Sequence, residues 1–292
     1  MTFPIFKKTS SFERLFIITA LVVIGFIASA IIGLAVTMLF NDLSKLNLLR
    51  ISQISSQLFV FVFPPLLYAI LVKEKPIKSL GFDRIPSWSL LGILMMYVIL
   101  PVNNILGELN SKITFPESMR NLEELFKTLQ EQATIVSEQM LNVSDISGLI
   151  INLIMIAGLA ALGEELLFRS LLQPFMAKIF KNIHIGIFVT SAIFSFIHFE
   201  IYGFLPRFVM GMLLGYMFYY SRTIWIPILM HFANNATVVI LYFLNNKGIT
   251  NIDVETFGQM GTFPLILSII AMAGLFWYTI RCSKKEFKNI EQ

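Results

Sequence analysis

The sequence carries little charge and a single cysteine. Only 14% of its 292 residues are Asp, Glu, Lys or Arg, whereas soluble domains carry about a quarter. Cys282 alone cannot form an intrachain disulfide or a cysteine-based zinc site, and we interpret it as an unmodified thiol near the end of the last apolar run. No basic stripe alternates with exposed aromatics, so the net charge of +4 does not indicate a nucleic-acid partner.

Long apolar runs take the place of the missing charge, since 56% of the residues are hydrophobic. A helix needs about 20 apolar residues to cross a bilayer. The runs predict an all-α, polytopic membrane bundle of about eight transmembrane helices, at residues 15–40, 53–72, 88–108, 148–172, 183–199, 205–221, 224–244 and 263–281. The first run is longer than the ~7–15 residues of a signal-peptide core, so we expect a retained span.

The placement of Lys and Arg predicts how the chain crosses the membrane. With both termini in the cytoplasm, the inside segments carry fourteen of the 22 basic residues, Lys7, Lys8 and Lys73 among them. The outside segments carry seven, and Arg169, at a span end, is counted with neither side. We therefore expect an integral protein of the cell (inner) membrane with both termini cytoplasmic.

The longest connection, residues 109–147, contains an amphipathic segment. Within residues 117–140, apolar residues recur at three- or four-residue spacing, which predicts a helix lying on the membrane surface between the third and fourth spans. We interpret it as a linker helix packed over the loops, and a lid or substrate guide is the alternative.

No internal repeat or low-complexity segment divides the chain, so we predict one membrane domain over residues 1–292. The unusual polar residues are concentrated in its later spans. Residues 148–244 are therefore the predicted functional core, and the family resemblance described below implies that this core is catalytic.

Two adjacent carboxylates, Glu164 and Glu165, interrupt the apolar fourth span. Each charge at a helix centre costs about 2.5–3.5 kcal/mol on insertion scales, so such residues usually face a bundle interior or a wet cavity. Arg169 follows Glu165 by four residues and shares its helix face, while Glu164 projects about 100° away. We predict a Glu165–Arg169 ion pair that leaves Glu164 for proton transfer. A purely structural ion-paired cluster is the alternative.

Two of the three histidines, His198 and His231, also lie in apolar spans, and Asn235 follows His231 by one helical turn. Each alone could simply form hydrogen bonds between helices. Together with Glu164 they form a set that can activate water and stabilise an oxyanion, or bind a divalent metal such as zinc. The third histidine, His184, begins the fifth span beside Lys181, and we interpret it as interfacial.

Taken in order, these motifs resemble those of the CPBP intramembrane proteases, a family that joins the eukaryotic CAAX prenyl endopeptidases to the bacterial Abi, or bacteriocin-immunity, proteins. The matching positions are Glu164-Glu165-x-x-x-Arg169, Phe194-x-x-x-His198 and His231-x-x-x-Asn235. Gly211, Gly215 and the run Trp225-x-Pro227-x-x-x-His231 look like the family as well. The resemblance covers about residues 150–240, one third of the chain.

The resemblance implies a peptidase that cleaves within or beside the membrane. Glu164 and His198 would activate the water, and His231 and Asn235 would stabilise the oxyanion. Glu165, Arg169 and Phe194 would support the site. The family has been described both as metalloproteases and as metal-free glutamate proteases; a metal, if used, would be held by Glu164, His198 and His231. We favour the metal-free mechanism, because the chain has no His-Glu-x-x-His motif and the candidate ligands sit on three helices.

Two other functions compete with proteolysis. A non-catalytic scaffold or regulator, in immunity or signalling, could use the same fold, although this chain keeps every motif residue. A proton-coupled transporter could also bury Glu and His, but no inverted repeat or pair of broken helices is visible. The partners expected of the protease are the lipid bilayer and a membrane-associated peptide or protein, with no nucleic acid.

Overall fold

The structure is a computed structural model that describes residues 9–40, 42–72, 75–254 and 256–288. All regular secondary structure within these ranges is helical, which confirms the predicted all-α membrane bundle. Three of the basic residues assigned to the cytoplasmic side, Lys7, Lys8 and Lys73, lie outside the described residues.

Six helices in the described ranges are long and apolar enough to cross a membrane. They are α1 (Ser11–Leu39), the continuous α2–η1–α3 (Lys45–Ser56, Gln57–Val62, Phe63–Val72), the continuous α8–η4–α9–η5–α10 (Ile146–Asn152, Leu153–Leu159, Ala160–Glu165, Leu166–Leu172, Gln173–Phe180), η6–α12 (Ile201–Gly203, Phe204–Ser221), α13 (Trp225–Asn246) and α14 (Thr262–Phe287). A bent pair could form a seventh crossing; it consists of η2–α5 (Ser87–Leu90, Leu91–Val98) and α6 (Leu100–Ser111). The predicted count of eight is not confirmed, and six or seven spans are supported.

Two predicted spans are not straight, full crossings. Between α5 and α6 the axis bends by 44°, and Pro101, the second residue of α6, has no N–H to bond the preceding turn. Helix α11 (Ile183–Phe196) has only 14 residues. Three residues after it ends, Phe199 has a φ of 55°, a left-handed conformation that bulky side chains rarely adopt. The chain therefore turns here instead of continuing across the membrane.

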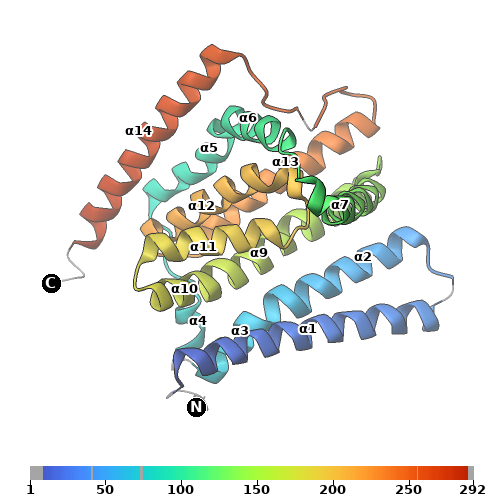
Figure 1. The fold of residues 1–292 in the computed structure, drawn as a ribbon, viewed down its shortest axis with the longest axis horizontal. Coiled ribbons are helices and arrows are strands. Elements are labelled where there is room, and N and C mark those ends of the chain that lie inside the picture. Colours follow the sequence, from blue (N-terminus) through green and yellow to red (C-terminus); the bar gives the residue numbers. More distant parts are fainter. Residues whose placement is uncertain (1–8, 41, 73–74, 255, 289–292) are drawn as a thin grey trace.

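The helices that carry the predicted motifs, α9 to α13, occupy the centre of the bundle (Figure 1). The hairpin of α1 and α2 lies along one side, and α5, α6 and α14 lie along the other. Helices α10 and α11 pack closely because Gly186 has no side chain: a Cβ there would lie 2.6 Å from the backbone nitrogen of Ala177.

Helix α1 begins and α14 ends at the same end of the bundle, on the left of Figure 1. Hydrogen bonds bring other segments to that end: Trp88 Nε1 donates to Glu286 at 2.9 Å, and Ser283 Oγ donates to the carbonyl of Tyr220 at 2.8 Å. The short α4 (Pro76–Ser79) follows the second span. Two termini at one end agree with the predicted topology, while the assignment of that end to the cytoplasm stays a prediction.

The helix predicted between the third and fourth spans is α7 (Arg120–Leu141), which follows the turn η3 (Glu117–Met119). It packs over the connection between α11 and α12. The rings of Phe126 and Phe196 are 6.3 Å apart, and the Tyr202 hydroxyl donates to Glu123 at 3.0 Å. These contacts agree with the linker interpretation. Placement of α7 at the membrane surface stays a prediction.

Candidate active site

Glu164 and Glu165 lie near the middle of the long helix that runs from α8 to α10. The six residues of α9 that contain them are flanked by two wider π-helical segments, η4 and η5. Such π-turns occur often at functional sites. Both carboxylates are buried, with 8% of Glu164 and none of Glu165 exposed, so each needs charged or hydrogen-bonding partners.

Glu165 finds two such partners. Its Oε2 lies 3.0 Å from Arg169 Nε, and its Oε1 lies 2.8 Å from His231 Nδ1. Arg169 also donates to the carbonyl of Gly211 at 3.1 Å, and its guanidinium carbon lies 4.6 Å from the centre of the Phe194 ring. Glu165 thus connects the fourth span to α13, and Arg169 connects it to α12.

Glu164 faces a different set of groups. Its Oε2 lies 4.0 Å from His198 Nε2 and 3.9 Å from His231 Nε2. Within the described part of the chain, this buried oxygen has no hydrogen-bond partner. Its Oε1 accepts a hydrogen bond from Gln57 Nε2 at 3.5 Å. The structure therefore brings Glu164, His198 and His231 together around one carboxylate oxygen.

The second nitrogen of each imidazole determines what its Nε2 can do. His198 Nδ1 lies 2.7 Å from the Phe194 carbonyl oxygen, which can only accept, so Nδ1 carries the hydrogen. His231 Nδ1 likewise donates to Glu165. In the neutral rings both Nε2 atoms are then acceptors directed at Glu164. The carboxylate beside His231 also stabilises its cationic form, whereas His198 has only a neutral carbonyl.

Phe194 holds the two imidazoles and the guanidinium in place. It is fully buried, and its ring centre lies 5.1 Å from that of His198 and 6.0 Å from that of His231, both in edge-to-face geometry. Such packing restricts ring rotation at low conformational cost. Phe194 is thus a neighbour of every imidazole at the site.

The fourth span continues to Phe180 instead of ending at 172, and this extra length explains how His198 lies level with Glu164. Interpreting residues 183–199 as a full crossing places His198 toward the opposite side of the membrane from Glu164. Instead, His198 lies fifteen residues beyond Ile183, roughly 22 Å at 1.5 Å per residue. Glu164 lies sixteen residues before Phe180, roughly 24 Å. The two residues therefore lie at the same depth.

Asn235 is not joined to these groups by a hydrogen bond in the described structure. Its amide nitrogen donates to the carbonyl of Ile156 at 3.2 Å, and its oxygen accepts from Asn234 at 3.1 Å. Asn235 therefore links α13 to η4, and its oxyanion role stays a proposal.

His184 Nδ1 lies 3.0 Å from the Tyr216 hydroxyl, at the far end of α11 from His198.

The three candidate metal ligands do not form a zinc site as they are placed. No group of three or more His, Cys, Asp or Glu side chains in the described ranges is arranged to hold a metal ion. Two ligands of a tetrahedral zinc with bonds of about 2 Å lie roughly 3.3 Å apart, whereas Glu164 Oε2 lies 3.9 and 4.0 Å from the two nitrogens. As placed, Glu164, His198 and His231 therefore do not fit a tetrahedral zinc.

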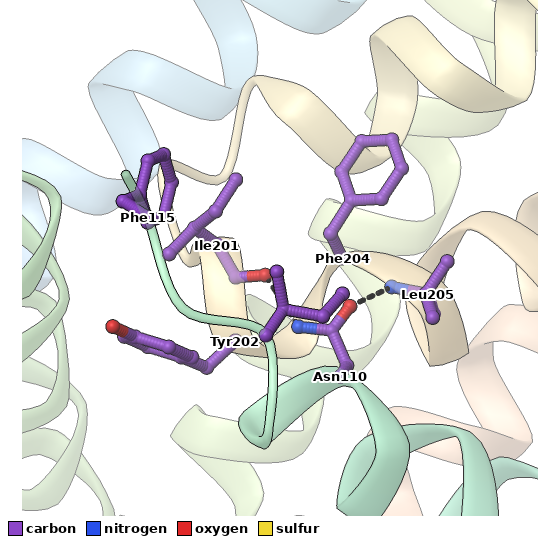
Figure 2. Close-up of a pocket in the computed structure, with 7 residues that line it drawn as sticks. Asn110, Phe115, Ile201, Tyr202, Phe204 and Leu205 are labelled. Atoms are coloured by element: carbon purple, nitrogen blue, oxygen red, sulfur yellow. Dashed lines mark hydrogen bonds between the residues drawn. The ribbon is translucent and has the colours of Figure 1, made fainter. Parts of the chain in front are cut away.

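Two buried amides near the site were missed by sequence reasoning, Gln57 on η1 and Asn110 on α6. Gln57 lies in the predicted second span and Asn110 in the predicted 109–147 connection, both outside the motif region, so neither stands out from the polar residues near it in sequence. Asn110 bridges the turn that follows His198: its amide nitrogen donates to the Ile201 carbonyl at 2.7 Å, and its oxygen accepts from Leu205 N at 2.9 Å. Figure 2 shows this amide beside a cavity of about 140 Å³ lined mainly by apolar side chains.

Replacing Asn110 with alanine should lower the free energy of unfolding by about 1–3 kcal/mol, because it leaves buried backbone groups without partners. The turn that follows His198 should loosen, so the rate of any cleavage should fall as well. Unfolding in mixed micelles measures the first effect. Asn103→Ala on the same helix is the matched control, since Asn103 Oδ1 has no partner in the described structure. Equal losses in both variants would contradict a specific role for Asn110.

The comparisons with known proteins agree with this geometry. Residues 146–237, about a third of the chain, match the family model described as type II CAAX prenyl endopeptidase Rce1-like. No curated protein and no solved structure matches the chain. The matched residues contain Glu164, His198 and His231, and they support the resemblance of this integral membrane protein to the CPBP, or CAAX, proteases.

Proposed function

We propose that the protein is an intramembrane endopeptidase that hydrolyses a peptide bond of a membrane-associated protein or peptide. One observation carries the proposal: an unpartnered, buried carboxylate oxygen of Glu164 lies within 4.0 Å of two imidazole Nε2 atoms. Polar groups separated by more than 3.5 Å are often joined by a water. A water here would be the nucleophile.

Glu164 acts as the base in this mechanism. It takes one proton from the water while His198 Nε2 accepts a hydrogen bond from the other, which orients the oxygen toward the substrate carbonyl. The new carbon–oxygen bond produces a tetrahedral oxyanion. Glu164 then returns its proton to the amide nitrogen as the carbon–nitrogen bond breaks. Glu164 is ionised again at the end of the reaction.

His231 is the group that faces the oxyanion. In its cationic form Nε2 donates a hydrogen bond, and Glu165 on Nδ1 stabilises that cation. Arg169 and Phe194 hold Glu165 and the imidazoles in position. Asn235, one turn beyond His231, is proposed as the second donor to the oxyanion, which requires its amide to turn away from Ile156.

The substrate class follows from the surroundings of the site. The site is enclosed by membrane-spanning helices, so an apolar or lipid-anchored peptide is the chemistry that fits. The matched family description names CAAX prenyl endopeptidases, and a prenylated C-terminal peptide is one member of that class. Both kinds of peptide need to be tested.

Replacing His198 with alanine should abolish cleavage while the protein still folds and inserts, because His198 has no charged partner closer than 4.0 Å. The purified wild-type protein is incubated with two probes, a digest of membrane proteins and a farnesylated CAAX peptide, and new peptide ends are identified by mass spectrometry. His184→Ala is the matched control and should cleave normally. The proposal is wrong if the wild type produces no new ends from either probe.

A further inference from the structure

Gln57 is a buried amide in the second span. It begins the π-helical segment η1, and 4% of its surface is exposed. Burying an amide costs free energy unless hydrogen bonds compensate for it. Gln57 also lies outside residues 146–237, so the family match does not account for it.

The described partner of Gln57 is the carboxylate assigned above as the base. Gln57 Nε2 donates to Glu164 Oε1 at 3.5 Å, across 107 residues of sequence. The other end of the amide, Oε1, is buried and has no hydrogen-bond partner in the described structure. The two oxygens of Glu164 are thereby divided, with Oε1 toward Gln57 and Oε2 toward the histidines.

A glycine makes this approach possible. A Cβ on Gly163 would lie 2.9 Å from Phe61 Cβ and 3.2 Å from Gln57 Oε1. Any larger residue at this position would push η1 and the Gln57 amide away from α9. The second span and the fourth span are therefore fitted to each other next to Glu164.

We propose that Gln57 is a positioning residue that holds Glu164 in both of its protonation states. The inference rests on the proposed peptidase function. When Glu164 is ionised, Gln57 Nε2–H donates to its Oε1. When Glu164 carries on Oε2 the proton taken from water, its Oε1 is a carbonyl oxygen that still accepts from Gln57 Nε2–H.

Glutamine suits this task better than other side chains. An amide donates a hydrogen bond and is uncharged at every pH at which proteins fold. A lysine would add a positive charge that weakens Glu164 as a base, and a glutamate would place a second negative charge beside it. An apolar residue would leave Glu164 Oε1 free to rotate, so Oε2 would spend less time facing the water.

Gln57→Met tests the proposal, because methionine keeps the length of the side chain and removes both polar atoms. Cleavage of the best peptide found with the wild type should lose roughly ten- to a hundred-fold in kcat, the effect of one hydrogen bond to a charged group. KM and the unfolding temperature should be unchanged. Gln53→Met, one turn earlier on the same helix, is the matched control and should behave as wild type. Gln57→Glu, which cannot donate when ionised, should lose at least as much.

The outcomes separate this inference from the function on which it rests. A wild type without cleavage overturns the peptidase function itself. A cleaving wild type with normal kcat in Gln57→Met overturns only the role of Gln57. Equal losses in Gln57→Met and Gln53→Met, or a loss that follows a fall in unfolding temperature, would show a general packing role instead. If Gln57→Met does not fold, Gln57→Glu decides, since a normal kcat there contradicts the proposal.

Discussion

Replacing Glu164 with glutamine should slow peptide cleavage by about 10²–10⁴-fold, the usual contribution of general acid–base catalysis. Glutamine has nearly the same shape but cannot take a proton from water. The fold should persist, because no basic side chain among the described residues forms an ion pair closer than 3.9 Å with this carboxylate. The measurement is the cleavage rate per folded molecule, with folding checked by thermal unfolding in detergent.

Two further variants make this result specific. Glu165→Gln should impair both cleavage and stability, since Glu165 bonds Arg169 and His231 directly. Glu138→Gln, on the exposed face of α7, should change neither. Cleavage by Glu164→Gln at the wild-type rate would contradict its role as the base. Losses of stability equal to those of Glu165→Gln would contradict the separation of the two carboxylates into different roles.

The sequence predicts which residues form this cluster better than it predicts how they are arranged in space. Glu164, His198 and His231 stand out because each is polar in an apolar run, and helical spacing assigns Arg169 to Glu165. Gln57 and Asn110 are as polar and as buried, but their partners lie 107 and 91 residues away in sequence. Periodicity along one helix carries no information about such distant contacts.

The number of spans illustrates the same limit. Hydropathy marks the long apolar helices, yet it does not show that α11 stops after 14 residues. That stop depends on the left-handed backbone of Phe199 and on the bridge that Asn110 makes to Ile201 and Leu205. Both are tertiary features, and they form the turn that follows His198.

Replacing Arg169 with methionine should lower the free energy of unfolding by about 3–5 kcal/mol, the usual cost of removing one partner from a buried ion pair. Arg169 is 1% exposed and Glu165 is fully buried, so no water can replace the lost charge. Unfolding in mixed micelles measures the loss. The matched control is Arg120→Met on α7, whose i,i+4 pair with Glu124 is exposed and should contribute little.

A double variant, Glu165→Leu with Arg169→Met, distinguishes stability from function. Buried ion pairs can often be replaced by apolar residues with little loss of stability, so the double variant should be more stable than Arg169→Met alone. Cleavage should not return, because His231 Nδ1 has then lost the carboxylate that fixes its hydrogen and stabilises its cation. If cleavage did return with stability, Glu165 would serve only to neutralise Arg169. If neither returned, the pair would be required for the packing of η5 against α12, through the bond from Arg169 to Gly211.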